Sequence, residues 1–84
     1  MAQLKAHHYE QGKKWLEDII GKLEEQKMEI ESVRDEEQEM LDCMPESLQE
    51  SERGQTMSEN IDELDSAASD LDDIISSLQE IVDK

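Results

Sequence analysis

Residues 56–83 read TMSENIDELDSAASDLDDIISSLQEIVD, and this stretch decides the fold. Apolar residues recur in it at alternating steps of three and four, the period of a helix that packs along one seam. The seam positions are Met57, Ile61, Leu64, Ala68, Leu71, Ile75, Leu78 and Val82. A second apolar row beside the seam consists of Ala67, Ile74 and Ile81. An apolar surface of that width favours a bundle of three or four helices over a two-stranded zipper.

A second long helix is predicted over residues 16–43, where apolar residues recur with the same period. The expected seam is Leu16, Ile19, Leu23, Gln26, Ile30, Val33, Glu37, Met40 and Met44, with Gln26 and Glu37 as polar interruptions. Residues 44–55 are predicted to form a connector, because Pro45 favours the start of a new turn and Gly54 a left-handed stop. Thr56 and Glu59 have the spacing of a capping box, so the next helix is expected to start there.

The expected fold is therefore all-α, with residues 1–84 as a single domain of two long antiparallel helices. Residues 1–15 should project beyond the shorter partner helix as a helical arm. Two helices bury only one stripe each, so we expect a homodimer that forms a four-helix bundle. Trp15, Tyr9, Ile74 and Ile81 are the candidate contacts for the dimer or another partner, with Trp15 and Tyr9 on the arm.

The formal charge is -16, and its distribution is uneven. Lysines and acids cancel in residues 1–27, whereas residues 56–83 hold nine acids and no Lys or Arg. Such a chain should be repelled by nucleic acid and anionic membranes and attracted to basic proteins. No run approaches the roughly 20 apolar residues of a membrane span, and a single cysteine, Cys43, fits a reducing cytoplasm.

The sequence offers no catalytic constellation, so we predict no enzyme activity, no cofactor and no metal site. It has no Gly-rich phosphate loop and no Glu-x-x-His motif, and a catalytic triad cannot be assembled from it. The candidate partner-binding residues are acids: Asp62, Glu63, Asp65, Asp70, Asp72 and Asp73, with Glu36 and Glu39 opposite. The net charge per length of two paired helices falls between those of single-stranded and duplex DNA, which is the physical case for nucleic-acid mimicry. Solvated acids on an assembly protein are the alternative.

The motif Leu41-Asp42-Cys43-Met44-Pro45-Glu46, followed by Ser47-Leu48-Gln49 and by Ile61-Asp62-Glu63-Leu64, resembles a set of small uncharacterised acidic proteins. These are encoded by phages and mobile elements of gram-positive bacteria, and the resemblance covers about residues 30–82. An Asn commonly stands in that family where this chain has Cys43. The resemblance implies a bacterial host cytoplasm and, by analogy with anti-CRISPR proteins, an inhibitor of host defence.

Together these features predict a non-catalytic inhibitor that occupies the basic nucleic-acid groove of a host protein, such as a nuclease, as a nucleic-acid mimic. The alternative function is a phage structural adaptor or scaffold that acts through coiled-coil self-association.

Overall fold

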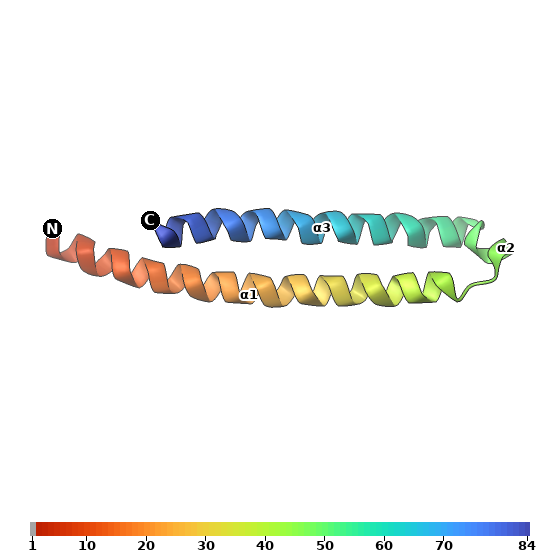
Figure 1. Cartoon of the computed structure of the whole chain (residues 1–84), viewed down its shortest axis with the longest axis horizontal. Helices are drawn as coiled ribbons and strands as arrows, with labels where there is room; N and C mark the ends of the chain where they lie inside the picture. The colour runs from red at the N-terminus through yellow and green to blue at the C-terminus, as the bar shows by residue number, and fades with distance from the viewer. Residues whose placement is uncertain (1) are drawn as a thin grey trace.

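The computed structural model describes the backbone of residues 2–84 and the side chains of residues 10–84. Within this range α1 spans Ala2–Asp42, α2 spans Glu46–Gln49 and α3 spans Glu52–Asp83. The two long helices run antiparallel and side by side, with α2 in the connection at one end (Figure 1). The hairpin measures 68 × 15 × 14 Å, and α1 extends past the end of α3 (Figure 1). The predicted all-α pair of long helices is confirmed, whereas the four-helix bundle stays a prediction.

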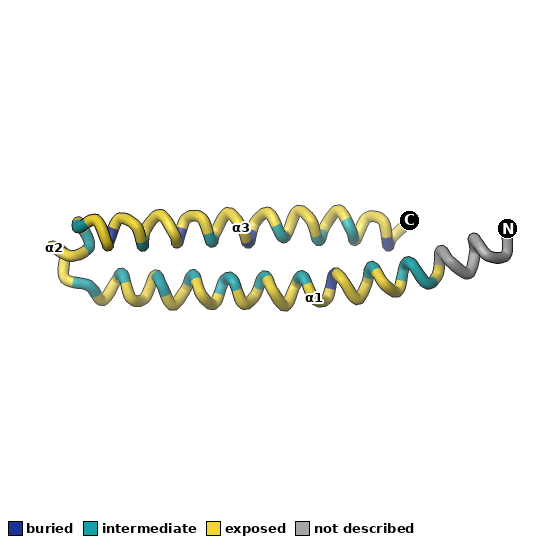
Figure 2. The backbone as a smooth tube through the Cα atoms, turned by 180° about the vertical axis from the view of Figure 1, so that it is seen from behind, coloured by how far each residue is buried: buried dark blue, intermediate teal, exposed yellow. Residues whose placement is uncertain are grey.

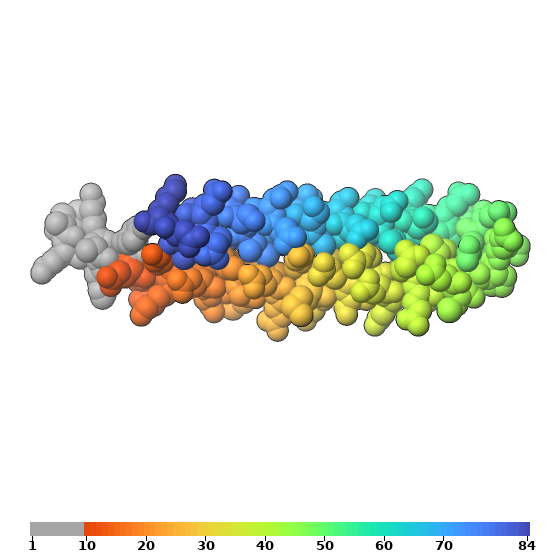
Figure 3. Space-filling model, viewed as in Figure 1, coloured from red at the N-terminus to blue at the C-terminus, as the bar shows by residue number. Residues whose placement is uncertain are grey.

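The buried and half-buried residues of each long helix are turned toward the other helix (Figure 2). On α3 these are the predicted seam residues, and three of them, Ile61, Ala68 and Val82, are at most 6% exposed. The side chains of α1 and α3 mesh along the hairpin in the space-filling view (Figure 3). The period read from residues 56–83 therefore identified the packed side of α3.

The seam of α1 differs in phase from the predicted one. From residue 16 onward the buried and half-buried residues are Leu16, Ile20, Leu23, Lys27, Ile30, Glu31, Arg34, Glu37 and Leu41 of α1 and Met44 just after it, and all but Glu31 follow one alternation of three and four. The residues expected there, Ile19, Gln26, Val33 and Met40, are exposed, and each immediately precedes a true seam residue. Ile20 and Leu41 are as apolar as the residues they displace, so hydrophobicity alone does not choose between the two phases.

The phase of α1 is explained by two cations that lie in its seam. Lys27 Nζ is 2.8 Å from Asp72 Oδ1, and Arg34 Nη1 is 2.7 Å from Asp65 Oδ1. The two cationic side chains are only 23% and 27% exposed, because their aliphatic stems cover the seam while their charged ends reach the acids of α3. Each pair links a seam cation of α1 to the residue that immediately follows a seam residue of α3.

The ion pairs also affect titration. The hydrogen bond from Lys27 to Asp72 raises the pKa of the lysine, against partial desolvation. Hydrogen bonds to Asp65 and then Asp35 raise the pKa of Arg34 in the same way. A raised pKa means that folding favours the protonated, positively charged form of each side chain. The stabilisation from the two ion pairs is therefore fully present at neutral pH. It is lost only as the pH rises through the raised pKa values.

The start of α3 was predicted wrongly at Thr56. The helix begins at Glu52, and its N-cap is Ser51, whose Oγ accepts a hydrogen bond from Gly54 N at 3.3 Å. The same hydroxyl donates to the Leu48 carbonyl. Ser and Thr are both good N-cap residues, so the sequence offered two starting points, and the chain uses the earlier one.

Gly54 is not the predicted left-handed stop but a buried residue in the first turns of α3. A Cβ atom placed on it would lie 2.2 Å from the Gln49 carbonyl oxygen and 2.5 Å from that of Leu48. Glycine is needed here because the backbone of the connector approaches α3 closely. Leu48 itself is 50% exposed.

The end of α1 is closed by a side chain from the connector. Gln49 Nε2 donates hydrogen bonds of 3.0 Å to the carbonyl oxygens of Leu41 and Met44. The Leu41 carbonyl lies in the last turn of α1, where carbonyls have no partner within the helix, and it also accepts a hydrogen bond from Met44 N at 3.1 Å. Gln49 thus holds the connector against the end of α1.

Candidate binding surface

The predicted acidic residues do not form one ridge. With roughly 100° per residue, the six candidate acids of α3 cover about half of its circumference, and all are exposed. Asp65 and Asp72 lie on one side of the hairpin and are engaged with Arg34 and Lys27. Glu63 precedes a seam residue and lies toward the other side. Acids thus cover the outside of α3, and two of them stabilise the hairpin itself.

On the side opposite the ion pairs the hairpin carries an apolar strip. The strip consists of the apolar residues that immediately precede seam residues: Ile19, Val33 and Met40 of α1 with Ala67, Ile74 and Ile81 of α3. The polar Gln26 interrupts the α1 row between Ile19 and Val33. The large members of the strip are between 43% and 57% exposed. The candidate contacts Ile74 and Ile81 therefore lie on this strip. The α1 half was missed because its residues had been assigned to the seam.

A groove between the helices shows that the two rows of the strip lie on one side of the hairpin. Val33 and Glu37 of α1 line it together with Asn60, Glu63 and Leu64 of α3, and its volume is about 310 Å³. Asn60 occupies the same row of α3 as Ala67 and Ile74, at a spacing of seven residues. The groove has a mixed lining and contains Val33 of the strip. The strip thus runs along the shallow channel between the two helices on this side of the hairpin.

Glu37, which lines this groove, carries an unsatisfied polar atom. Its Oε2 atom is buried and has no hydrogen-bond partner within the part of the chain that the structure describes. A buried carboxylate oxygen without a partner is costly. A hydrogen-bond donor that entered the groove would remove this cost.

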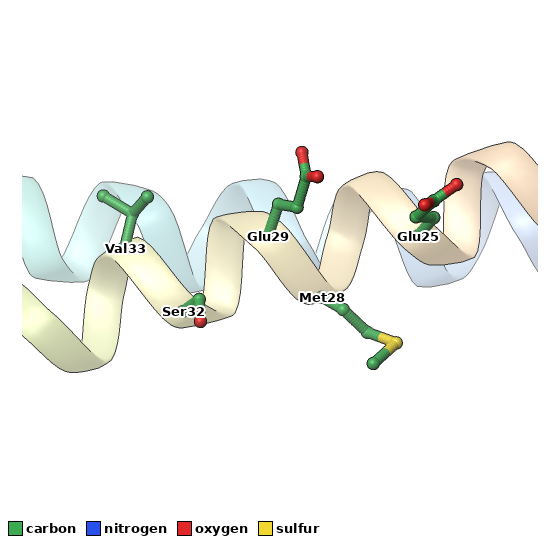
Figure 4. Close-up of a pocket in the computed structure, with 5 residues that line it drawn as sticks. All are labelled: Glu25, Met28, Glu29, Ser32 and Val33. Carbon is green, nitrogen blue, oxygen red and sulfur yellow. The ribbon is translucent and has the colours of Figure 1, made fainter.

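The strip is bordered on each side by two acids, which we call the acidic edges. Figure 4 shows Glu29 and Val33 directed to the same side of α1, whereas Met28 points away. These residues surround a shallow hollow on a single helix, so the hollow itself is no binding site. Each edge acid stands four residues before a strip residue, which places it one turn away on the same side. The edges are Glu29 and Glu36 on α1, and Glu63 and Asp70 on α3.

The aromatic anchors lie at the far end of α1. Trp15 is 55% exposed and stands one turn before Ile19, at the end of the strip. The side chain of Tyr9 lies outside the described residues, as do those of His7 and His8. Cys43 is exposed and near Met40, at the opposite end of the strip.

Among the side chains of residues 10–84, no three His, Cys, Asp or Glu residues are grouped so that they could hold a metal ion. No described helix has the length and apolarity needed to cross a bilayer. No family model, curated protein or solved structure matches the chain. The resemblance to phage-encoded acidic proteins accordingly stays a prediction.

Proposed function

We propose that the protein is a non-catalytic assembly module, an incomplete helical bundle that another chain completes along the apolar strip. The observation that carries this proposal is the exposure of the strip. Within the described side chains, four hydrophobic residues are buried whereas eight large ones are exposed. Five of these eight form the strip and do not lie scattered over the surface. A contiguous exposed apolar surface is typical of a protein interaction site.

The geometry of the strip suits a helical partner. Two antiparallel helices form a channel along their length, and a further helix that lies in it buries apolar rows of both. The predicted homodimer is one way to supply such helices, and an adaptor or scaffold role needs no other site. Catalysis has no place in this function.

Ile74→Glu should strongly weaken partner binding, because it places a charge in the middle of the packed strip. The tagged chain is isolated from its host, and the amount of each copurifying protein is compared with that on the unchanged chain. We expect at least a tenfold loss, which corresponds to about 1.4 kcal/mol.

Met28→Glu is the matched control, since Met28 is 68% exposed and points away from the strip. It adds the same charge to the same hairpin and should keep the partner. The assembly role is contradicted if both variants retain the partner equally, or if both lose it equally while remaining folded.

Nucleic-acid mimicry is the second candidate, favoured by the acidic surface of α3. From residue 56 to 83 there is no Lys or Arg, and Asp62, Asp70 and Asp73 are exposed with no ion pair to a described cation. Such a surface would suit the basic nucleic-acid groove of a host protein, such as a defence nuclease. In that case Asp62→Asn with Asp73→Asn should weaken binding, DNA should displace the partner, and Ile74→Glu should have no effect. Asp65 and Asp72 are unsuitable for this test because their loss would also destabilise the hairpin.

A further inference from the structure

We infer that the segment completing the bundle is a basic amphipathic helix, one with an apolar stripe flanked by Lys or Arg on both sides. This inference rests on the proposed assembly function and identifies the chemistry of the partner. The apolar strip would take the stripe, and the acidic edges would pair with the flanking cations.

The dimensions of the strip fit a single helix. From Ile19 to Met40 the strip runs along α1 for roughly 32 Å at 1.5 Å per residue, which is the length of a helix of about 20 residues. The apolar row of α3, from Ala67 to Ile81, covers roughly 21 Å of this length, and the polar Asn60 continues it beside Val33 and Glu37. A third helix would therefore contact both rows at once and present one flank to each acidic edge.

The charges around the strip distinguish a basic partner from a second copy of this chain. The acidic edges contribute Glu29, Glu36, Glu63 and Asp70, all exposed. Two hairpins that met strip to strip would bring the acidic edges of both copies together. Like charges facing each other oppose association.

Few cations of this chain could offset that repulsion. Beside the strip, Lys22 is the one cation in the row of Glu29 and Glu36, and it is paired with Asp18 at 3.0 Å, while Lys27 is paired with Asp72. Between residues 28 and 83 the only cations are Arg34 and Arg53. Arg34 is paired with Asp65 on the opposite side of the hairpin, and Arg53 lies in the first turn of α3. By contrast, the cations on the two flanks of a basic helix would be attracted to the acids of both edges.

Glu37 supplies an independent reason for a cationic donor. Glu37 lines the groove with Val33 and Asn60, near the Met40 end of the strip, and its buried Oε2 atom has no hydrogen-bond partner among the described residues. A Lys or Arg side chain from a helix in the channel would donate a charge-assisted hydrogen bond to it. A second copy would place another apolar row or another acid there.

The test uses three synthetic peptides of 20 residues with the same apolar stripe and with Lys, Gln or Glu on both flanks. Binding to the full chain is measured by calorimetry at low and moderate salt, and the contact is mapped by NMR shifts of the Val33 methyls. We expect the Lys peptide to bind at least tenfold more tightly than the Gln peptide, to lose affinity as salt rises, and to shift Val33. The Glu peptide should not bind.

A pair of chain variants separates a local contact from general attraction. Glu36→Lys with Glu63→Lys changes both acidic edges and should weaken the Lys peptide at least tenfold. Glu59→Lys with Asp73→Lys makes the same change of net charge on the outside of α3, away from the strip, and should weaken it much less.

Each other outcome overturns part of this account. If the Gln peptide binds as tightly as the Lys peptide, or both chain variants lose affinity equally, the basic flanks are wrong and the assembly function stands. If no peptide shifts Val33 and the free chain dimerises through the strip, the occupant is a second copy. If no peptide binds and Ile74→Glu leaves every partner in place, the assembly function fails as well.

Discussion

Replacing Gly54 by alanine is expected to lower the free energy of unfolding by roughly 3 kcal/mol, at the upper end of the usual cost of overpacking. The new Cβ atom would lie 2.2 Å from the Gln49 carbonyl oxygen. That atom belongs to the backbone, so it cannot rotate away as a flexible side chain would. Either the connector must move or α3 must unwind at its start, and the hydrogen bonds that Gln49 makes to the end of α1 would then be disturbed. Urea denaturation followed by circular dichroism measures the loss.

Gly21→Ala is the matched control for this substitution. Gly21 is also helical and is exposed, and a Cβ atom there would meet nothing within 4 Å. Because alanine is the better helix former, this change should stabilise the hairpin by about 0.5–1 kcal/mol. Equal stability of the two variants would show that the connector does not approach Gly54 as closely as the structure has it.

Reversing both seam cations, Lys27→Glu with Arg34→Glu, should lower the melting temperature by roughly 10 °C at low salt. The change replaces two cross-helix attractions of under 3 Å with repulsion from Asp72 and Asp65. It also makes the net charge of the chain more negative than its present -16. Added salt should recover part of the loss, because screening weakens the repulsion. Thermal unfolding at two salt concentrations provides the measurement.

Two further variants distinguish the ion pairs from net charge. Lys22→Glu with Lys84→Glu produces the same net charge at two exposed positions and should cost much less. Adding Asp65→Lys and Asp72→Lys to the reversed chain restores both attractions in the opposite sense and should restore most of the stability. If the swapped chain stays as unstable as the reversed one, these pairs do not link the helices in solution.

The fold could be predicted from the sequence because only one phase of the apolar repeat in α3 gives an apolar packed side. All seam positions from Met57 to Val82 are apolar, and any other phase would bury acids. On α1 two phases compete, since Ile19 and Ile20 are adjacent, as are Met40 and Leu41. Which phase α1 adopts depends on Lys27 and Arg34. These cations lie in the seam because Asp72 and Asp65 of α3 pair with them. Because the pairing acids belong to α3, the phase of α1 cannot be predicted from the sequence of α1 alone.

The connector and the binding surface were harder to predict for related reasons. Ser51 and Thr56 are both of a type that favours the N-cap position, and the close contact of Gly54 with the connector, which accompanies the earlier start, is tertiary. The acids of α3 were grouped by sequence, but two of them face the seam cations. The strip is apparent only in the structure, in which Val33 lies outside the seam.

The most direct test of the account uses the two valines of the chain, Val33 and Val82. Val33 is 48% exposed on the strip, whereas Val82 is 6% exposed in the seam. With only the valine methyls labelled, a soluble paramagnetic agent should broaden the Val33 signals strongly and leave those of Val82 sharp. The measurement is made at a concentration where sedimentation shows a monomer. Equal protection of both valines would then contradict the account, because Val33 would lie within the seam.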